Sequence, residues 1–114
     1  MERVSAADVE EDSFAGVTVS RLSDPLGTED LAINHYRLAP GESFSAGMHT
    51  HLDQEEVFYV VEGTATFETE AGEVDVAAGE AVRFAPGDYQ TGRNDAENGD
   101  RVHVRQSTQA PSSM

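Results

Sequence analysis

The chain has 114 residues, a length typical of one domain. It contains no cysteine, which excludes disulfides and thiolate metal ligands. It also lacks a run of the roughly 18 apolar residues that a membrane-spanning helix needs. No basic segment followed by an apolar one opens the sequence, so we expect a cytoplasmic protein without a secretory signal.

The formal net charge at pH 7 is −15, and all seven positions that hold lysine or arginine hold arginine. Such a charge strains a compact fold by self-repulsion, and at ~1 M salt the screening length of about 3 Å removes most of that strain. We therefore hypothesise a halophilic protein from a salt-accumulating cell, the alternative being a merely acidic protein. No basic patch is present to neutralise phosphates, so nucleic acid and anionic membranes are not expected partners.

Short β-favouring segments separated by turn signals make up most of the chain. Residues 1–12 are polar and acidic, and form either a loose arm or one short helical turn capped by Ser5 and Asp8. The predicted strands lie around residues 17–19, 31–38, 57–61, 64–69, 74–76, 81–84 and 101–105, with turns at 23–27, 71–72, 78–80 and 85–88. Residues 106–114 are predicted to be a disordered tail. This pattern of roughly eight strands is typical of an all-β sandwich or barrel.

Two histidines one residue apart, His49 and His51, are the strongest functional signal. On a strand they point to the same side, and Glu56 follows after a short corner. Imidazoles with a carboxylate suit a divalent transition metal such as iron, manganese, nickel or zinc. The alternative is a structural role, in which these polar side chains are partly buried and hydrogen-bond to one another.

The spacing resembles the first motif of the cupin superfamily. His49 and His51 are followed by four residues, Glu56, six residues and Gly63. The six-residue interval selects Glu56 over Glu55, and alternation agrees because Glu56, Phe58 and Val60 share a face. The glycine that usually begins this motif is replaced by Ser43.

The second motif of the family is matched in part. Gly79, Gly87 and Asn94 fall in register, whereas the proline expected at position 85 is one place later, at Pro86. The histidine expected as the fourth metal ligand is Gln90. Gln90 would then complete the metal shell as a weak neutral ligand, hydrogen-bond a metal-bound water or substrate, or mark a site that has lost its metal.

The resemblance covers about residues 31–104 and implies a cupin-type jelly-roll β-barrel. It implies a single cupin domain over residues 1–114, with the barrel at about 15–105, a polar N-terminal arm at 1–12 and a C-terminal tail at 106–114. The metal ligands would be His49, His51, Glu56 and Gln90. Cupins usually close the barrel with longer apolar strands after the second motif, and only Val102 and Val104 are apolar in that region here, so the barrel is expected to be open at one edge or completed by a partner chain.

Two functions are compatible with these observations. One is a metal-dependent enzyme, dioxygenase- or isomerase-like, acting on a small organic molecule in the barrel. The other is a non-catalytic small-ligand binding or sensing barrel with a degenerate or structural metal site. The apolar outward side of residues 57–61 must be covered, and the resemblance to small cupins implies a homodimer.

Other polar residues are interpreted as structural. If Tyr36 and Leu38 face the core, then Asn34 does too and His35 faces outward. We expect His35 and His103 to be surface or interface histidines. Arg83 and Arg93 are the only cations near the second motif and form no cluster, so a phosphorylated substrate receives little support.

Overall fold

The computed structural model describes residues 1–14, 17–44, 54–95 and 99–109. Within these ranges the structure contains nine strands and two short helical turns. In chain order they are η1 (Ala6–Asp8), β1 (Glu11–Phe14), β2 (Val17–Arg21), α1 (Ser23–Leu26), β3 (Leu31–Leu38), β4 (Glu56–Glu62), β5 (Thr64–Thr69), β6 (Gly72–Ala77), β7 (Ala81–Phe84), β8 (Gln90–Arg93) and β9 (Val102–Gln109). Neither helical turn has the length or the apolar character needed to cross a membrane.

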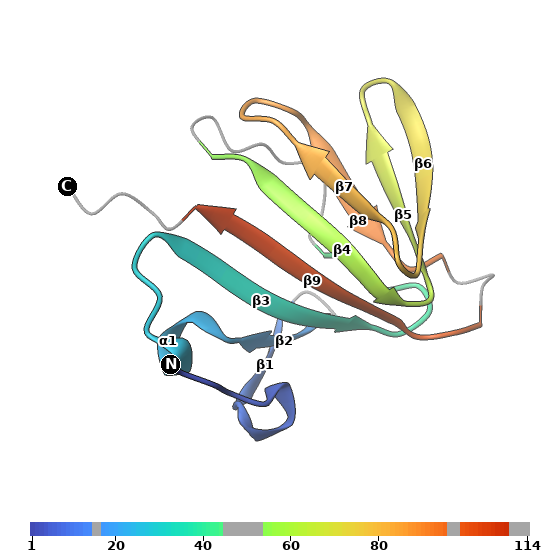
Figure 1. Ribbon diagram of the computed structural model, residues 1–114. Helices are drawn as coiled ribbons and strands as arrows, with labels where there is room; N and C mark the ends of the chain where they lie inside the picture. The colour runs from blue at the N-terminus through green and yellow to red at the C-terminus, as the bar shows by residue number, and fades with distance from the viewer. Residues whose placement is uncertain (15–16, 45–53, 96–98, 110–114) are drawn as a thin grey trace.

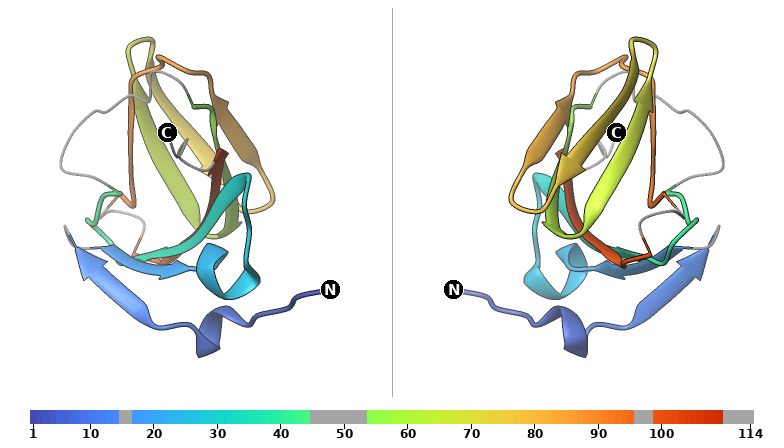
Figure 2. Two further views of the ribbon diagram at one scale, coloured as in Figure 1. Left: turned by 90° about the vertical axis from the view of Figure 1, so that its left-hand side faces the viewer. Right: turned by 90° about the vertical axis from the view of Figure 1, so that its right-hand side faces the viewer.

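The strands form two antiparallel sheets. Six strands lie in the order β1-β2-β3-β9-β4-β7, and three lie in the order β6-β5-β8 (Figure 1). Seen from the sides, the two sheets face each other around a common interior, and β1 lies at the outer edge of the larger sheet (Figure 2). The predicted all-β, jelly-roll barrel fold is confirmed.

The core is built from alternate residues of both sheets. Phe58 and Val60 of β4 meet Ala65 and Phe67 of β5, with the ring centroids of Phe58 and Phe67 5.1 Å apart. Phe44 lies beside both rings, which joins the segment after β3 to the same aromatic cluster. Burial of these rings is the main favourable term for closing the two sheets on each other.

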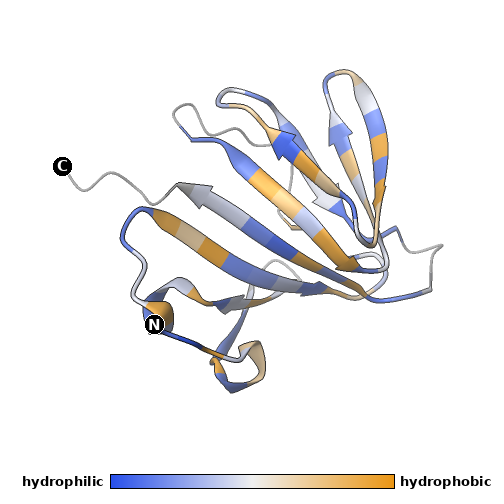
Figure 3. Cartoon of the chain, viewed as in Figure 1, coloured by the Kyte–Doolittle hydropathy of each residue, from blue (hydrophilic) through white to orange (hydrophobic). Residues whose placement is uncertain are grey.

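Strand β4 is apolar along most of its length, and its two faces have different surroundings (Figure 3). Glu56, Phe58 and Val60 are buried, as alternation predicted. On the outward face Tyr59 and Val61 are 43% and 39% exposed. The described part of one chain therefore leaves this outward face uncovered.

The strands that the sequence did not predict are polar. Strand β1 carries Glu11, Asp12 and Ser13 and pairs with β2. A loose arm was one of the two expectations for residues 1–12. The helical alternative at the N-terminus is found, although its cap is a backbone bond from Asp8 N to Ser5 O of 3.0 Å and not a side chain. The turn at 23–27 is one turn of helix, which ends at Gly27 with φ 72°.

The end of the last strand is a correction to the prediction. A strand was expected over 101–105 and a disordered tail from 106, whereas β9 continues to Gln109. It lies between β3 and β4 and pairs with both, so its backbone groups are satisfied on either side. Strand β9 therefore completes the larger sheet within the chain itself.

Candidate metal and ligand site

Glu56 is a carboxylate at the inward-facing start of β4, and it is only 6% exposed. The Nε2 atom of Gln90 on β8 donates to its Oε1 at 3.1 Å. The Nε2 atom of Gln106 on β9 donates to its Oε2 at 2.7 Å. The structure thus brings together Glu56 and Gln90, two of the four site residues predicted from the sequence.

The β7–β8 turn and a close sheet contact place Gln90. The turn bends at Gly87, with φ 90°, and the carboxylate of Asp88 accepts a hydrogen bond from Ala85 N at 2.8 Å. Two residues after Gln90, a Cβ atom on Gly92 would lie 2.6 Å from Phe44 and 2.7 Å from Phe67. Because Gly92 has no side chain, β8 approaches the aromatic cluster closely, and Gln90 enters the barrel at 2% exposure.

Gln106 is a site residue that the sequence prediction missed, because it was assigned to the tail. It is 6% exposed, and its Oε1 accepts a hydrogen bond from Nδ2 of Asn34 on β3 at 2.9 Å. The alternation of Val102 and Val104 extends to position 106 and could have placed Gln106 in the interior. Asn34 was correctly expected to face inward.

Tyr36 adds a hydroxyl group to this region. Its ring packs edge-on against Phe44 at a centroid distance of 5.2 Å. Burial raises the pKa of Tyr36 above its ordinary value of 10.0, and the negative charge of Glu56 raises it further, against a smaller opposing effect of Arg21. Tyr36 is therefore a neutral hydroxyl at physiological pH.

The predicted ligands His49 and His51 lie outside the described residues. Within the described ranges, no three histidine, aspartate or glutamate side chains gather as a metal site. Glu56 nevertheless fits a metal by its chemistry, because a carboxylate held in one orientation by hydrogen bonds is a common ligand of divalent transition metals. Gln90 turns its nitrogen toward Glu56, so any metal bond would have to come from its oxygen.

The other two histidines lie outside the barrel. His35 and His103 contact each other edge-on at a centroid distance of 5.6 Å, on the outward face of β3 and β9. The Nδ1 atom of His103 lies 3.7 Å from Oε2 of Glu62. Burial lowers the pKa of His35, as do His103, Arg105 and Arg37 in decreasing order, while Glu11 opposes them. The outward orientation expected for His35 is correct.

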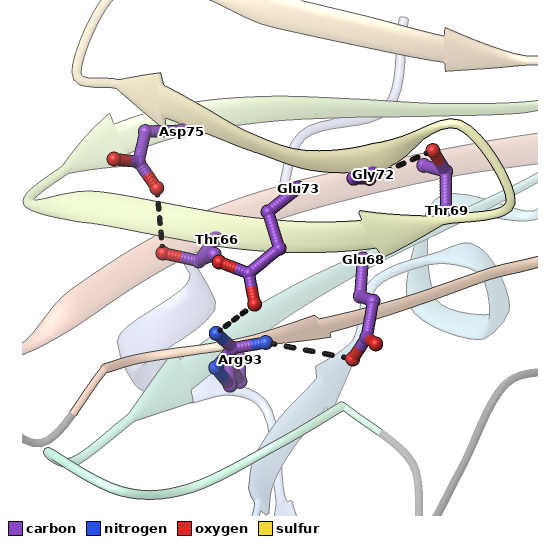
Figure 4. Close-up of polar contacts among 7 residues, drawn as sticks. All are labelled: Thr66, Glu68, Thr69, Gly72, Glu73, Asp75 and Arg93. Atoms are coloured by element: carbon purple, nitrogen blue, oxygen red, sulfur yellow. Dashed lines mark hydrogen bonds and ion pairs between the residues drawn. The ribbon is translucent and has the colours of Figure 1, made fainter.

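The two arginines near the second motif are held in separate ion pairs on the outside of the barrel. Arg93 contacts Glu73 at 2.9 Å and Glu68 at 3.8 Å across the smaller sheet (Figure 4). Its hydrogen bond to Glu73 is the main cause that raises the pKa of Arg93. Arg83 contacts Glu55 at 2.7 Å. Arg93 therefore links strands of the smaller sheet, and Arg83 links β7 to the residue before β4.

A surface cavity of about 360 Å³ lies between the β5–β6 hairpin and the β7–β8 turn. Its wall includes Phe84, Tyr89 and Thr69. Phe84 is the strand partner of Glu56, and Thr69 is the strand partner of Gln90. The cavity is thus at the same end of the barrel as the Glu56–Gln90 pair, and its volume is within the usual range of small-molecule sites, about 300–1,000 Å³.

Comparison with known proteins agrees with this architecture. A family model described as a cupin domain matches residues 34–104. No curated protein matches the chain. Among solved structures, the polyketide cyclase RemF from Streptomyces resistomycificus aligns with a TM-score of 0.84 and 21% identity over 97% of this chain and 80% of that chain.

Two further structures have the same fold. A sugar phosphate isomerase of the cupin superfamily from Silicibacter pomeroyi aligns with a TM-score of 0.80 and 20% identity, over 96% of this chain and 76% of that one. A predicted oxalate decarboxylase from Thermotoga maritima aligns with a TM-score of 0.81 and 16% identity, over 96% and 99% of the two chains. These likenesses establish the fold alone, because one fold carries many chemistries.

Proposed function

Because the chain belongs to the cupin family, we propose that it is a small metal-binding cupin that acts on a small organic molecule, in the manner of a dioxygenase or an isomerase. The observation that carries this proposal is the buried Glu56 carboxylate, which two amide groups from different strands hold in one orientation. Carboxylates that ligate metals are commonly oriented by such outer hydrogen bonds. Glu56 would ligate the metal together with His49 and His51.

The candidate metals are iron, manganese, nickel and zinc, since imidazole and carboxylate donors suit all four. The bound metal would supply a Lewis acid or an oxygen-binding centre. The chain itself supplies a neutral hydroxyl on Tyr36 and the amides of Gln90 and Gln106 around Glu56. The cavity beside Phe84 and Thr69 is the proposed approach for the organic ligand.

One observation favours a second function, that of a non-catalytic ligand-binding barrel. The nitrogen of Gln90 donates to Glu56, so at least this end of the amide orients the carboxylate and does not bind a metal. In this second function the metal would be structural or absent, and the polar interior would bind the small molecule directly. The two functions differ in whether metal is required.

Metal content per chain separates these functions, on protein purified in molar salt without chelators. Glu56→Gln keeps the size of the side chain but removes its charge. Glu55→Gln is its matched control, because Glu55 is the adjacent residue and pairs outward with Arg83. We expect near-stoichiometric metal in the natural protein and in Glu55→Gln, and loss of metal in Glu56→Gln and in the His49→Ala, His51→Ala double variant.

Absence of bound metal would favour the second function, the ligand-binding barrel. Protein that stays empty after reconstitution with each of the four metals contradicts the metal-dependent enzyme. Equal metal loss in Glu55→Gln and Glu56→Gln would also contradict it, because the site would then not depend on the inward carboxylate. Small-molecule binding to empty protein, unchanged by added metal, would support the binding barrel.

We further propose that the chain functions in the cytoplasm as a homodimer of a single cupin domain. The exposed Tyr59 and Val61 on the outward face of β4 are the apolar side chains that a second copy would cover. A net charge of −15 and the outward ion pairs of Arg83 and Arg93 argue against nucleic acid as a partner.

A further inference from the structure

Three consecutive hydrogen bonds connect side chains of β3, β9, β4 and β8. They run from Asn34 to Gln106, from Gln106 to Glu56 and from Gln90 to Glu56, with lengths of 2.9, 2.7 and 3.1 Å. Gln106 and Glu56 are buried, and Asn34 is partly buried. Asn34 thus forms the β3 end of this row of bonds, and Gln90 forms the β8 end.

The chemistry of the groups fixes the direction of each bond. An ionised carboxylate only accepts, so Gln106 must turn its nitrogen toward Glu56. The oxygen of the same amide then points to residue 34, where it needs a donor. Asn34 supplies that donor through Nδ2. Asn34 can present either end of its amide, so the acceptor-only carboxylate sets the direction of the bonds, and Asn34 completes them by satisfying the oxygen of Gln106.

We propose that Asn34 and Gln106 are positioning residues for Glu56, in which Asn34 donates to the oxygen of the Gln106 amide, keeps the nitrogen of that amide on Glu56, and so holds the carboxylate in its orientation inside the barrel. The role of Glu56 as a metal ligand rests on the proposed function. The row of hydrogen bonds from Asn34 through Gln106 to Glu56, called the relay below, does not rest on the proposed function, because all three residues are described in the structure. Sequence alone does not pair Asn34 with Gln106, since the two residues are 72 positions apart.

The substitution Asn34→Asp reverses the relay with almost no change in shape. The introduced aspartate accepts and does not donate, so it draws the nitrogen of Gln106 to itself. The oxygen of Gln106 then faces Oε2 of Glu56 with no proton between them, and the carboxylate is pushed out of its orientation. Loss of such an outer contact typically weakens metal binding by about 10- to 100-fold.

The first test measures the dissociation constant for Mn²⁺ and Zn²⁺ at fixed pH and molar salt. Asn94→Asp is the matched control, because Asn94 is also a buried asparagine and its Nδ2 donates to the backbone oxygens of Leu38 and Asp100. We expect Asn34→Asp to weaken binding by about 10- to 100-fold, and folded Asn94→Asp to bind as the natural protein does. Equal weakening in both variants, or unchanged binding in Asn34→Asp, would overturn the positioning role.

The second test needs no metal and uses unfolding of metal-free protein. Asn34→Asp, Glu56→Gln and the double variant form a cycle between two residues that the relay joins through Gln106. In the double variant the amide introduced at position 56 can donate to the reversed Gln106, so the bonds on both sides of Gln106 are restored. We expect a coupling of roughly tenfold in the unfolding equilibrium constant. Additive effects of the two substitutions would overturn the relay.

The same cycle repeated with Gln106→Met separates the relay from simple charge repulsion between the introduced aspartate and Glu56. Methionine is similar in length and has no amide, so coupling through residue 106 disappears while repulsion through space remains. Coupling that survives in the Met background would overturn the relay. Coupling lost there, in protein that binds no metal, would support the relay while contradicting the proposed metal function.

Discussion

Replacing Gly63 by alanine should destabilise the fold far more than replacing Gly79, although the two backbones are nearly the same. Their φ angles are 82° and 88°, in the left-handed region that costs a residue with a side chain about 1–2 kcal/mol. A Cβ atom on Gly79 would meet nothing within 4 Å. On Gly63 it would lie 2.5 Å from the backbone oxygen of Arg101 and 3.1 Å from a methyl group of Val102.

The difference between the two variants therefore isolates the clash. Val102 is fully buried and the oxygen of Arg101 belongs to the main chain, so neither can turn aside. Overpacking of this kind costs about 1–3 kcal/mol. We expect Gly79→Ala to lose about 1 kcal/mol, because alanine also restricts the unfolded chain, and Gly63→Ala to lose about 2–4 kcal/mol.

Urea unfolding at one molar-salt concentration measures both losses, with the slope of stability against urea as a check on two-state behaviour. A loss of about 1 kcal/mol corresponds to roughly 4 °C in melting temperature for a domain of this size. Equal losses for the two variants would refute the reasoning, because the cost would then be conformational and the approach of β4 to β9 would have no part in it. The close contact between residue 63 and the backbone at Arg101 accounts for a glycine at this position of the motif.

Further predictions concern pH, packing, salt and assembly. Burial and neighbouring positive groups lower the pKa of His35 below 6.5, so the stability linked to this group is present above pH 6.5 and is lost as pH falls through the lowered value. Stability between about pH 5 and pH 7 should thus change less with pH in His35→Gln than in the natural protein, and parallel curves would contradict this. Phe67→Ala removes a fully buried ring that contacts three others and should cost about 3–5 kcal/mol in urea unfolding, with Phe67→Leu in between. The natural protein should gain stability from low to molar salt as its charges are screened, and a flat salt series would count against a halophilic origin. Light scattering in molar salt should give a dimer mass that falls to a monomer mass in Tyr59→Glu, and a monomer mass for the natural protein would exclude the dimer.

The sequence predicts the parts of this fold where apolar residues alternate or form a run. Strands β3, β4, β5, β6 and β7 were expected close to their observed bounds for that reason. Strands β1 and β8 were missed because their residues are mostly polar, and they are strands through pairing with β2 and β5. Pairing partners distant in sequence are not visible in a local pattern.

The site residues were likewise predicted where a motif specifies them and missed where only the folded chain brings them together. The spacing to Gly63 selected Glu56, and the register of the second motif selected Gln90, and the structure places these two side chains in contact. Gln106 was missed because a glutamine near the end of a polar segment is most often solvated. Its burial depends on Glu56 and Asn34, which lie on strands that only the folded chain brings beside it.

The central place of β9 constrains the order in which the protein can form. Strands β3 and β4 do not pair with each other, and each pairs with β9 in the larger sheet. A growing chain on the ribosome therefore exposes two unpaired strand edges until residues 102–109 have been synthesised and released. Long-range pairing of this kind is slow, and open edges invite association with other chains. The strong negative charge carried by every nascent copy would keep those edges apart during that interval.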